Sequence, residues 1–344
     1  MEPRVEIGEG TGFEVLLAAA ALADPNWRET FATGQASHAE AEAILGPGFV
    51  RRVAALGRFG WINLAGLLTR AAPPWDLRRL IAMVSESAPE DVHYVAIGGD
   101  RRQLLDLLDE DVIRGALAGK RQARSRLGDV FASDAHVLEA TDWLLTSSSS
   151  AVRGEILELL DSWREQLLPS AAESALVVEL HRHATAAETR LAGIGSRAYL
   201  DETIGGLSYY PAGLDRVVAV SSPRVAPVIV VVDGREHTII LHPPIGGPED
   251  EADDTRRLLE LSRAVGDRTR MRLLTALRGG ELTAVDLARD LGAPRTTLLH
   301  HLAILRAAGL IHVSVTPGNA TLYRLRPAGF SELSGSAARS IPSA

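Results

Sequence analysis

The stretch TRMRLLTALRGGELTAVDLARDLGAPRTTLLHHLAILRAAGLIHVSVTPGNATLYRL, from Thr269 to Leu325, carries the clearest pattern of secondary structure in the chain. Met271, Leu274 and Leu277 recur at helical spacing and form one apolar stripe. Gly279-Gly280 follows the stripe and ends the predicted helix, because glycine is a poor helix former. The stretch therefore opens with an amphipathic helix.

A second helix is predicted to begin after Thr283. This threonine stands three residues before Asp286, which is the spacing of a capping box, with Asp in place of the usual Glu or Gln. Gly292 ends the helix, and a very short turn leads to Pro294, whose fixed φ suits the first turn of a third helix. The apolar residues of the second helix are Val285, Leu287 and Leu291.

The third helix has two distinct sides and ends at Gly309. One side is mainly apolar and carries Leu298, His301, Leu302, Leu305 and Ala308. The other side carries Arg295, Thr296, Leu299, His300, Ala303 and Arg306. The first side is predicted to face a core and the second side to face solvent or a ligand.

After Gly309 the apolar period changes from helical to two, which predicts strands. Two strands are expected on either side of the turn Pro317-Gly318-Asn319, and their apolar residues are Ile311, Val313, Val315, Leu322, Tyr323 and Leu325. Two helices joined by a tight turn and followed by a hairpin form a winged helix-turn-helix. The helix predicted over Pro294–Ala308 would enter the major groove of DNA, and the hairpin tip would lie near the backbone or minor groove.

The distribution of charge agrees with this interpretation. The segment from Asp253 to Phe330 contains 12 Arg and 7 Asp or Glu, for a net charge of +5. The preceding residues, Met1 to Ala252, contain 23 basic and 36 acidic residues, for a net charge of −13. A basic module on an acidic protein favours local binding to phosphate without general attraction to polyanions.

The segment from about Leu258 to Leu325 resembles the ArsR-type winged-helix family of bacterial transcription regulators. The residues that carry the resemblance are Asp267, Thr269-Arg270, Leu273-Leu274, Leu282-Thr283, Asp286-Leu287-Ala288, Leu291-Gly292, His300-His301-Leu302, Leu305-Arg306, Ala308-Gly309-Leu310 and Tyr323. The resemblance implies a homodimeric regulator, with repression as the commoner mode. The chain departs from the family where Arg268 replaces a frequent Pro, and where Pro294 and Leu299 replace Ser. It has Ala284-Val285 where soft-metal sensors of the family have Cys.

Seven residues are predicted to contact double-stranded DNA: Arg295, Thr296, Thr297, Leu299, His300, Arg306 and Asn319. Arg295 can reach a guanine edge or a phosphate, and phosphate is the more frequent partner of any single arginine. Thr296 and Thr297 can donate to phosphate or touch a thymine methyl, and Asn319 can donate from the wing. Leu299 either packs against the preceding helix or contacts a thymine methyl. His301, on the inner side, is predicted to be a packed core histidine, and His300 is the better candidate for DNA.

Composition limits the remaining possibilities. The chain has 344 residues, a net charge of −8, 46% hydrophobic and 23% charged residues, and no cysteine. The absence of cysteine excludes disulfides, thiolate zinc sites and thiol redox sensing. No signal peptide and no apolar run of ~18 residues occurs, so we expect a cytoplasmic protein with no membrane contact. No metal site and no cofactor are predicted.

The first three quarters of the chain predict a mainly α fold with small β elements. Successive helices are expected from Thr11 to about Ala192, followed by a small antiparallel sheet of three strands near 216–242, with helices packed on one of its faces. Asp233-Gly234 is a strong hairpin signal between the last two strands. The predicted organisation is an N-terminal domain over 1–243, a Pro/Gly/acidic linker over 244–254, a winged helix-turn-helix over 255–330 and a flexible tail over 331–344. Some ArsR-like regulators carry a long N-terminal domain of this kind, with unknown role, and the chain resembles them in organisation.

The N-terminal domain contains no sequence motif of catalysis that we recognise. His181 and His183 are two residues apart on a predicted helix, so they point to different faces and cannot ligate one metal together. An enzyme is therefore not expected. The domain is predicted to be either a sensor of a small-molecule effector that modulates DNA binding or a module for a partner protein that the winged helix tethers to DNA. A roomy pocket lined by Trp27, Trp61, Trp75 or Trp143, with a convergent polar group, would favour the sensor. A flat exposed apolar patch would favour the partner protein.

Overall fold

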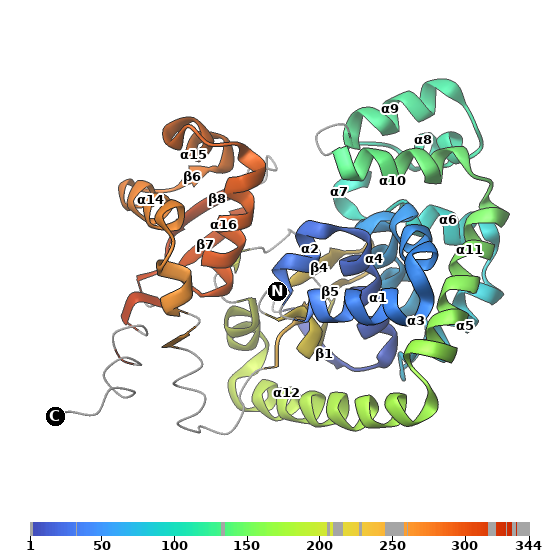
Figure 1. The fold of residues 1–344 in the computed structure, drawn as a ribbon, viewed down its shortest axis with the longest axis horizontal. Coiled ribbons are helices and arrows are strands. Elements are labelled where there is room, and N and C mark those ends of the chain that lie inside the picture. The colour runs from blue at the N-terminus through green and yellow to red at the C-terminus, as the bar shows by residue number, and fades with distance from the viewer. Residues whose placement is uncertain are drawn as a thin grey trace.

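The computed structural model describes residues 3–31, 33–131, 135–204, 207–208, 216–226, 229–244, 258–259, 261–315, 321–327, 329–331 and 335. These residues form a large helical N-terminal body and a smaller C-terminal body (Figure 1). The predicted linker over 244–254 lies outside the described residues except for Pro244. The predicted tail lies outside them except for Ser331 and Gly335.

The N-terminal body confirms the expected run of helices. Its helices are α1 (Thr11–Ala23), α2 (Pro25–Thr30), α3 (Gly34–Ala55), α4 (Gly57–Leu68), α5 (Leu77–Glu86), α6 (Pro89–Ala96), α7 (Arg102–Leu105), α8 (Glu110–Leu117), α9 (Arg121–Phe131), α10 (Ala135–Thr146), α11 (Ser149–Ser162), the π-helical turn η1 (Trp163–Leu167) and α12 (Ser170–Ile204). Gly46 and Pro47 interrupt the sequence of α3. Gly46 has φ 77°, so α3 is two helices joined by a kink there.

Helix α1 is the centre of this body. Every residue from Thr11 to Leu22 is buried, as expected for a helix that is apolar on all sides. Helices α3 and α4 pack against it, and Phe13 meets Trp75 edge to face with their ring centroids 5.8 Å apart. Trp61 and Trp75 are fully buried in this core, so neither is free to line an open pocket.

The sheet of the N-terminal body differs from the prediction. It has four strands in the order β1-β3-β5-β4, and these are β1 (Arg4–Gly8), β3 (Arg216–Ser221), β5 (Thr238–His242) and β4 (Val230–Asp233). The pairs β1–β3 and β3–β5 are parallel, and only β4–β5 is antiparallel. The predicted three-stranded antiparallel sheet was therefore wrong. The hairpin expected at Asp233-Gly234 is confirmed, since it joins the one antiparallel pair.

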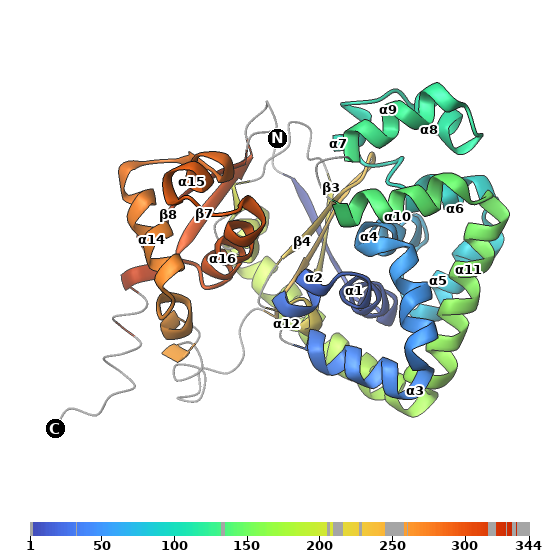
Figure 2. The ribbon, with the colours of Figure 1, turned by 45° about the horizontal axis from the view of Figure 1, so that its top comes forward.

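Both faces of this sheet are covered, and the prediction of one covered face was also wrong. Val218 and Val220 face the core around α1, and Val217 and Ala219 face the opposite side. On that opposite side they pack with Leu200 and other residues of α12, so the sheet lies between α12 and the layer that contains α1 (Figure 2). Burial on both faces explains why the strands are continuously apolar.

The C-terminal body is the expected winged helix-turn-helix. Its elements are a helical segment at 261–265, α14 (Arg268–Ala276), the short 3₁₀ helix η3 (Leu277–Gly279), β6 (Leu282–Thr283), α15 (Ala284–Leu291), α16 (Arg295–Ala307), β7 (Ile311–Val315) and β8 (Thr321–Leu325). Strands β7 and β8 are antiparallel, as predicted for the wing. Strand β6 pairs with β8. It was not predicted, because a strand of two residues is too short to show an alternating apolar pattern.

In the part of the chain that the structure describes, two pairs of elements join the two bodies. The short strand β2 (Leu207–Ser208), which follows α12, pairs in parallel with β7 at Val313 and Ser314. Helix α16 also contacts α2 (Figure 2). The wing sheet therefore has the order β2-β7-β8-β6, and one of its strands comes from the N-terminal part of the chain.

Candidate nucleic-acid interface

The turn between α15 and α16 is fixed by local geometry at both ends of α15. The Asp286 backbone N–H donates to the Thr283 hydroxyl at 3.1 Å, and the Thr283 backbone N–H donates to the Asp286 carboxylate at 3.2 Å. This is the predicted capping box. The hydrogen bonds from Thr283 hold the pKa of the Asp286 carboxyl below its usual value. At the other end Gly292 has φ 61°, a left-handed conformation that glycine adopts without steric cost.

The inner side of α16 is anchored in the core of the winged domain. Leu298, Leu302 and Leu305 are fully buried, as predicted from their spacing. The imidazole of His301 is mostly buried and its Nδ1 lies 3.6 Å from Asp267 Oδ1. Its place on the inner side is the predicted one.

Helix α14 packs against α16. Asp267 caps α14 by accepting a hydrogen bond from the Arg270 backbone N–H at 2.9 Å. That bond is the main reason why the pKa of the Asp267 carboxyl is lowered. The Arg270 guanidinium donates to the carbonyl oxygens of Ala264 and Arg263 at 2.7 and 2.6 Å. These hydrogen bonds join α14 to the helical segment before it, and α14 in turn packs against α16.

The outer side of α16 faces away from this core. Thr297 is exposed, and Leu299 keeps 37% of its surface accessible. Arg295, Thr296 and His300 lie on the same helix, and their side chains fall outside the described residues. Asn319 also lies outside the described residues.

Arg306, the last of the predicted contacts on α16, is partly exposed. Burial lowers the pKa of its guanidinium, and the nearby Tyr323 of β8 opposes that shift. Its contact with DNA stays a prediction.

Two exposed arginines of the winged domain were not among the predicted contacts. Arg268 begins α14 and Arg278 lies in η3, and neither has an ion-pair partner among the described residues. Arg289 and Arg324 are also exposed, but they pair with Asp286 and Glu281. The one signal in the sequence is that Arg268 and Arg278 flank the apolar stripe of the first predicted helix of this domain.

Two further properties bear on the kind of site. In the part of the chain that the structure describes, no group of three or more His, Cys, Asp or Glu is placed to hold a metal ion. Within the same part, no helix combines the length and the apolar character needed to cross a bilayer.

The comparison with known proteins agrees with the architecture of this segment. Residues 265–314 match the family described as Helix-turn-helix domain. The transcriptional repressor SdpR of Bacillus subtilis is 39% identical over 49 residues, which are 14% of this chain and 54% of that protein. The HTH-type transcriptional regulator CmtR of Mycobacterium tuberculosis is 40% identical over 68 residues, which are 20% of this chain and 57% of that protein.

The match thus covers little more than half the length of these relatives. No solved structure gives a significant match to the chain. The resemblance to winged helix-turn-helix regulators that the sequence predicted is confirmed over this segment. The C-terminal part of the chain is therefore a winged helix-turn-helix domain similar to those of bacterial transcriptional regulators.

Proposed function

We propose that the protein is a sequence-specific DNA-binding transcription regulator of the ArsR type. The observation that carries this proposal is α16, a helix with one side locked in the domain core and an outer side that presents Thr297 and Leu299 to solvent. That is the geometry with which a recognition helix enters the major groove. Arg295, Thr296, His300 and Arg306 lie on this helix and are the proposed base and phosphate contacts, and Asn319 is the proposed contact from the wing.

Affinity is proposed to come largely from arginine–phosphate contacts. The segment from Asp253 to Phe330 carries a net charge of +5 within a chain of net charge −8. Arg268 and Arg278 are exposed arginines of the same domain. Release of counterions by such contacts makes binding strongly dependent on salt.

We further propose that the protein acts as a homodimeric repressor that occludes a promoter. DNA half-sites are commonly read by a two-fold pair of domains. The helical segment at 261–265 places Leu261 in the core of the winged domain, whereas Leu259 just before it is 52% exposed. Leu259 is the proposed contact between protomers. Replacement by Glu should lower the apparent mass from dimer to monomer in analytical ultracentrifugation.

The N-terminal domain is proposed to modulate DNA binding. Two contacts support this role, namely the packing of α2 against α16 and the pairing of β2 with β7. An element that touches the recognition helix competes with DNA for access or fixes the orientation of that helix. Any movement of α2 therefore changes the free energy of DNA binding, which is the requirement for coupling between two sites.

The test is binding of the purified full-length chain to DNA from the region upstream of its own gene, across a salt series. The double variant Arg295→Ala/His300→Ala removes two proposed contacts. The matched control is Arg126→Ala/His181→Ala, which removes the same two residue types from exposed positions in the N-terminal domain. Tight, salt-sensitive and selective binding that the first variant loses and the control keeps is the expected result. Weak binding that is equal for all sequences and unchanged in the first variant would overturn the proposal.

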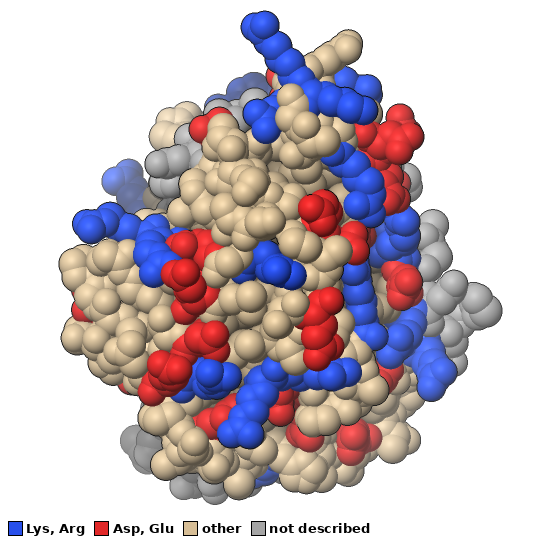
Figure 3. Space-filling view, turned by 90° about the vertical axis from the view of Figure 1, so that its right-hand side faces the viewer, with Lys and Arg blue, Asp and Glu red and all other residues tan. Residues whose placement is uncertain are grey.

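The alternative function, a partner-protein module tethered to DNA, finds less support. On the face opposite the winged domain, acidic and basic side chains are interspersed without a single-sign region (Figure 3). The exposed large apolar residues of the described part are scattered along the chain, and Val177 and Val178 are the two that adjoin in sequence. An extended apolar patch is the usual mark of a protein interface.

A further inference from the structure

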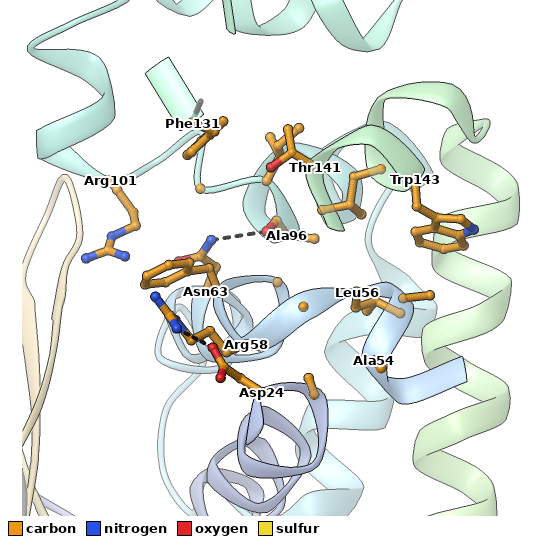
Figure 4. A pocket seen from close by; sticks show the side chains of 18 of the residues that line it. Asp24, Ala54, Leu56, Arg58, Asn63, Ala96, Arg101, Phe131, Thr141 and Trp143 are labelled. Atoms are coloured by element: carbon orange, nitrogen blue, oxygen red, sulfur yellow. Dashed lines mark hydrogen bonds and ion pairs between the residues drawn. The ribbon is translucent and has the colours of Figure 1, made fainter. Parts of the chain in front are cut away.

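A cavity of about 890 Å³ opens into the N-terminal body beside α4. Its wall is built from the end of α1, the ends of α3 and α6, and parts of α4, α7, α9 and α10 (Figure 4). This volume is in the range of sites for small molecules and cofactors. No step of the proposed DNA binding uses it.

Most of the wall is apolar or aromatic. The larger apolar side chains are Phe59, Leu104, Leu107, Phe131, Trp143 and Leu144. Of the four tryptophans whose presence in a pocket would indicate a sensor, Trp143 lines this cavity and Trp27 lies just outside it. Such a wall favours a ligand that buries apolar surface against it.

The arginines of the inner wall are neutralised by the protein itself. Arg58 forms an ion pair with the buried carboxylate of Asp24, and its guanidinium lies over the ring of Phe59 at 4.6 Å. Arg101 pairs with the buried Asp233 at 2.6 Å. These two cations thus have internal counter-charges, and the third arginine of the wall, Arg51, is exposed. The inner part of the wall therefore carries little unbalanced charge for an anionic ligand.

Asn63 is a buried polar group in the wall of the cavity. Its side chain is 3% exposed and its Nδ2 donates to the carbonyl oxygen of Ala96 at 3.1 Å. This bond fixes the amide orientation, because a carbonyl can only accept. Asn63 Oδ1 then has no hydrogen-bond partner among the described residues. A buried acceptor left unpaired is costly in an apolar site, so a hydrogen-bond donor on a ligand would be favourable there. Asn63 Oδ1 has almost no accessible surface, so the donor reaches it when the adjoining side chains of the wall move.

Gly98 keeps the space next to this amide open. A Cβ at Gly98 would lie 3.0 Å from Asn63 Nδ2, and the φ of 87° at this position disfavours other residues. The backbone after α6 therefore curves closely around Asn63.

From this geometry we propose that the cavity binds an uncharged, mainly aromatic or apolar small molecule whose N–H or O–H donates to Asn63 Oδ1. This ligand class is the proposed class of effector. The effect of the ligand on DNA affinity rests on the proposed regulatory function, whereas binding of the ligand to the cavity does not.

A short path joins the cavity to the recognition helix. Asp24 and Pro25 belong to the cavity wall, and Pro25 is the first residue of α2. Arg58 holds this corner through its pair with Asp24 and through the ring of Trp27 on α2, 5.7 Å away. Since α2 contacts α16, a ligand that displaces Arg58 or Pro25 acts directly on the contact to α16.

The first test uses N-phenyl-1-naphthylamine, an uncharged fluorescent probe with one N–H donor. Its matched partner is 1-benzylnaphthalene, in which a methylene group replaces the N–H. With the full-length protein we expect saturable fluorescence enhancement by the amine. We also expect roughly tenfold weaker competition by the hydrocarbon, as for one lost hydrogen bond. Equal affinity of the two compounds, or no saturable binding, would overturn the proposal.

Three variants locate the probe. In Asn63→Leu the two compounds should bind with equal affinity, because the acceptor is gone. Ala54→Phe fills the cavity from α3 and should weaken both compounds by at least roughly tenfold, whereas Ala43→Phe, at an exposed position of the same helix, should weaken neither. Unchanged binding in Ala54→Phe would place the probe elsewhere and refute the site, even if Asn63→Leu fails to fold.

DNA binding is then measured with and without the probe. A change in affinity for DNA that Ala54→Phe abolishes supports the coupling through α2, and an unchanged affinity refutes it. Failure of all DNA binding with normal probe binding would overturn the proposed regulator and leave the ligand site standing. Failure of probe binding with normal DNA binding would overturn the ligand site and leave the proposed regulator standing.

Discussion

The guanidinium of Arg101, at the start of α7, is bound to the carboxylate of Asp233, at the end of β4, 132 residues later. Arg101 Nε and an Arg101 terminal nitrogen donate to Asp233 Oδ1 at 2.8 and 2.6 Å, and the Gln103 backbone N–H donates to Asp233 Oδ2 at 3.0 Å. Asp233 is 1% exposed. The aspartate that the sequence indicated as a hairpin residue therefore also joins the sheet to the wall of the cavity.

Loss of Arg101 should destabilise the N-terminal body strongly. Arg101→Ala leaves the carboxylate of Asp233 buried without its counter-charge, so we expect the free energy of unfolding to fall by about 3–5 kcal/mol. Urea denaturation followed by circular dichroism measures this. Arg126→Ala, at an exposed position, should change it by less than about 0.5 kcal/mol. An equal effect of both variants would show that the Arg101 pair contributes no more than a surface arginine.

The capping box of α15 should be detectable as local stability. Thr283→Ala removes the acceptor for the Asp286 backbone N–H and should cost about 1 kcal/mol. Hydrogen exchange of the α15 amides should then be roughly fivefold faster, since 1.4 kcal/mol corresponds to a factor of ten. Thr283→Ser keeps the hydroxyl and should exchange like the parent protein. Unchanged exchange in Thr283→Ala would count against the cap as a stabilising contact.

Glu14 should make the protein less stable as the pH rises toward neutrality. Burial in α1 raises the pKa of its carboxyl to about 7, against 4.5 for the ordinary group. The folded state therefore holds this proton more tightly than the unfolded state does. The resulting stabilisation is complete below about pH 4.5 and is lost as the pH passes through about 7. The total is on the order of 3 kcal/mol.

The variant Glu14→Gln isolates this effect. It removes the titrating group, so it should be more stable than the parent protein at pH 8, and the difference between the two should shrink as the pH falls to 4.5. Taking the difference at each pH cancels the contribution of His242, whose pKa burial lowers to about 4 and which destabilises the fold on acidification. A difference in unfolding free energy that does not vary with pH would contradict the raised pKa of Glu14.

Leu299 is predicted to read a thymine methyl group. Its side chain is 37% exposed on the outer side of α16. Replacement of single thymines in the bound DNA by deoxyuridine removes that methyl, and at one position we expect about a fourfold loss of affinity, the equivalent of about 0.8 kcal/mol. Leu299→Ala should show no such loss at that position in the same gel-shift titration. If parent and variant lose affinity equally at every thymine, Leu299 does not make this contact.

The sequence by itself determined the winged helix-turn-helix. Its signals are local: Thr283 and Asp286 are three residues apart, Gly292 ends α15, and the spacing of Leu298, Leu302 and Leu305 defines the buried side of α16. Such features depend on hydrogen bonds and periodicity within one or two turns, which a linear pattern records directly.

Only the tertiary structure decided the sheet and the cavity. Strand β1 pairs in parallel with β3 across more than 200 residues, and no local pattern specifies a partner at that distance. The position of Asn63 opposite Ala96 likewise depends on which segments pack together. Side-chain partners of this kind follow from the packing of the whole chain, because a buried group takes its hydrogen bonds from whatever the fold brings beside it.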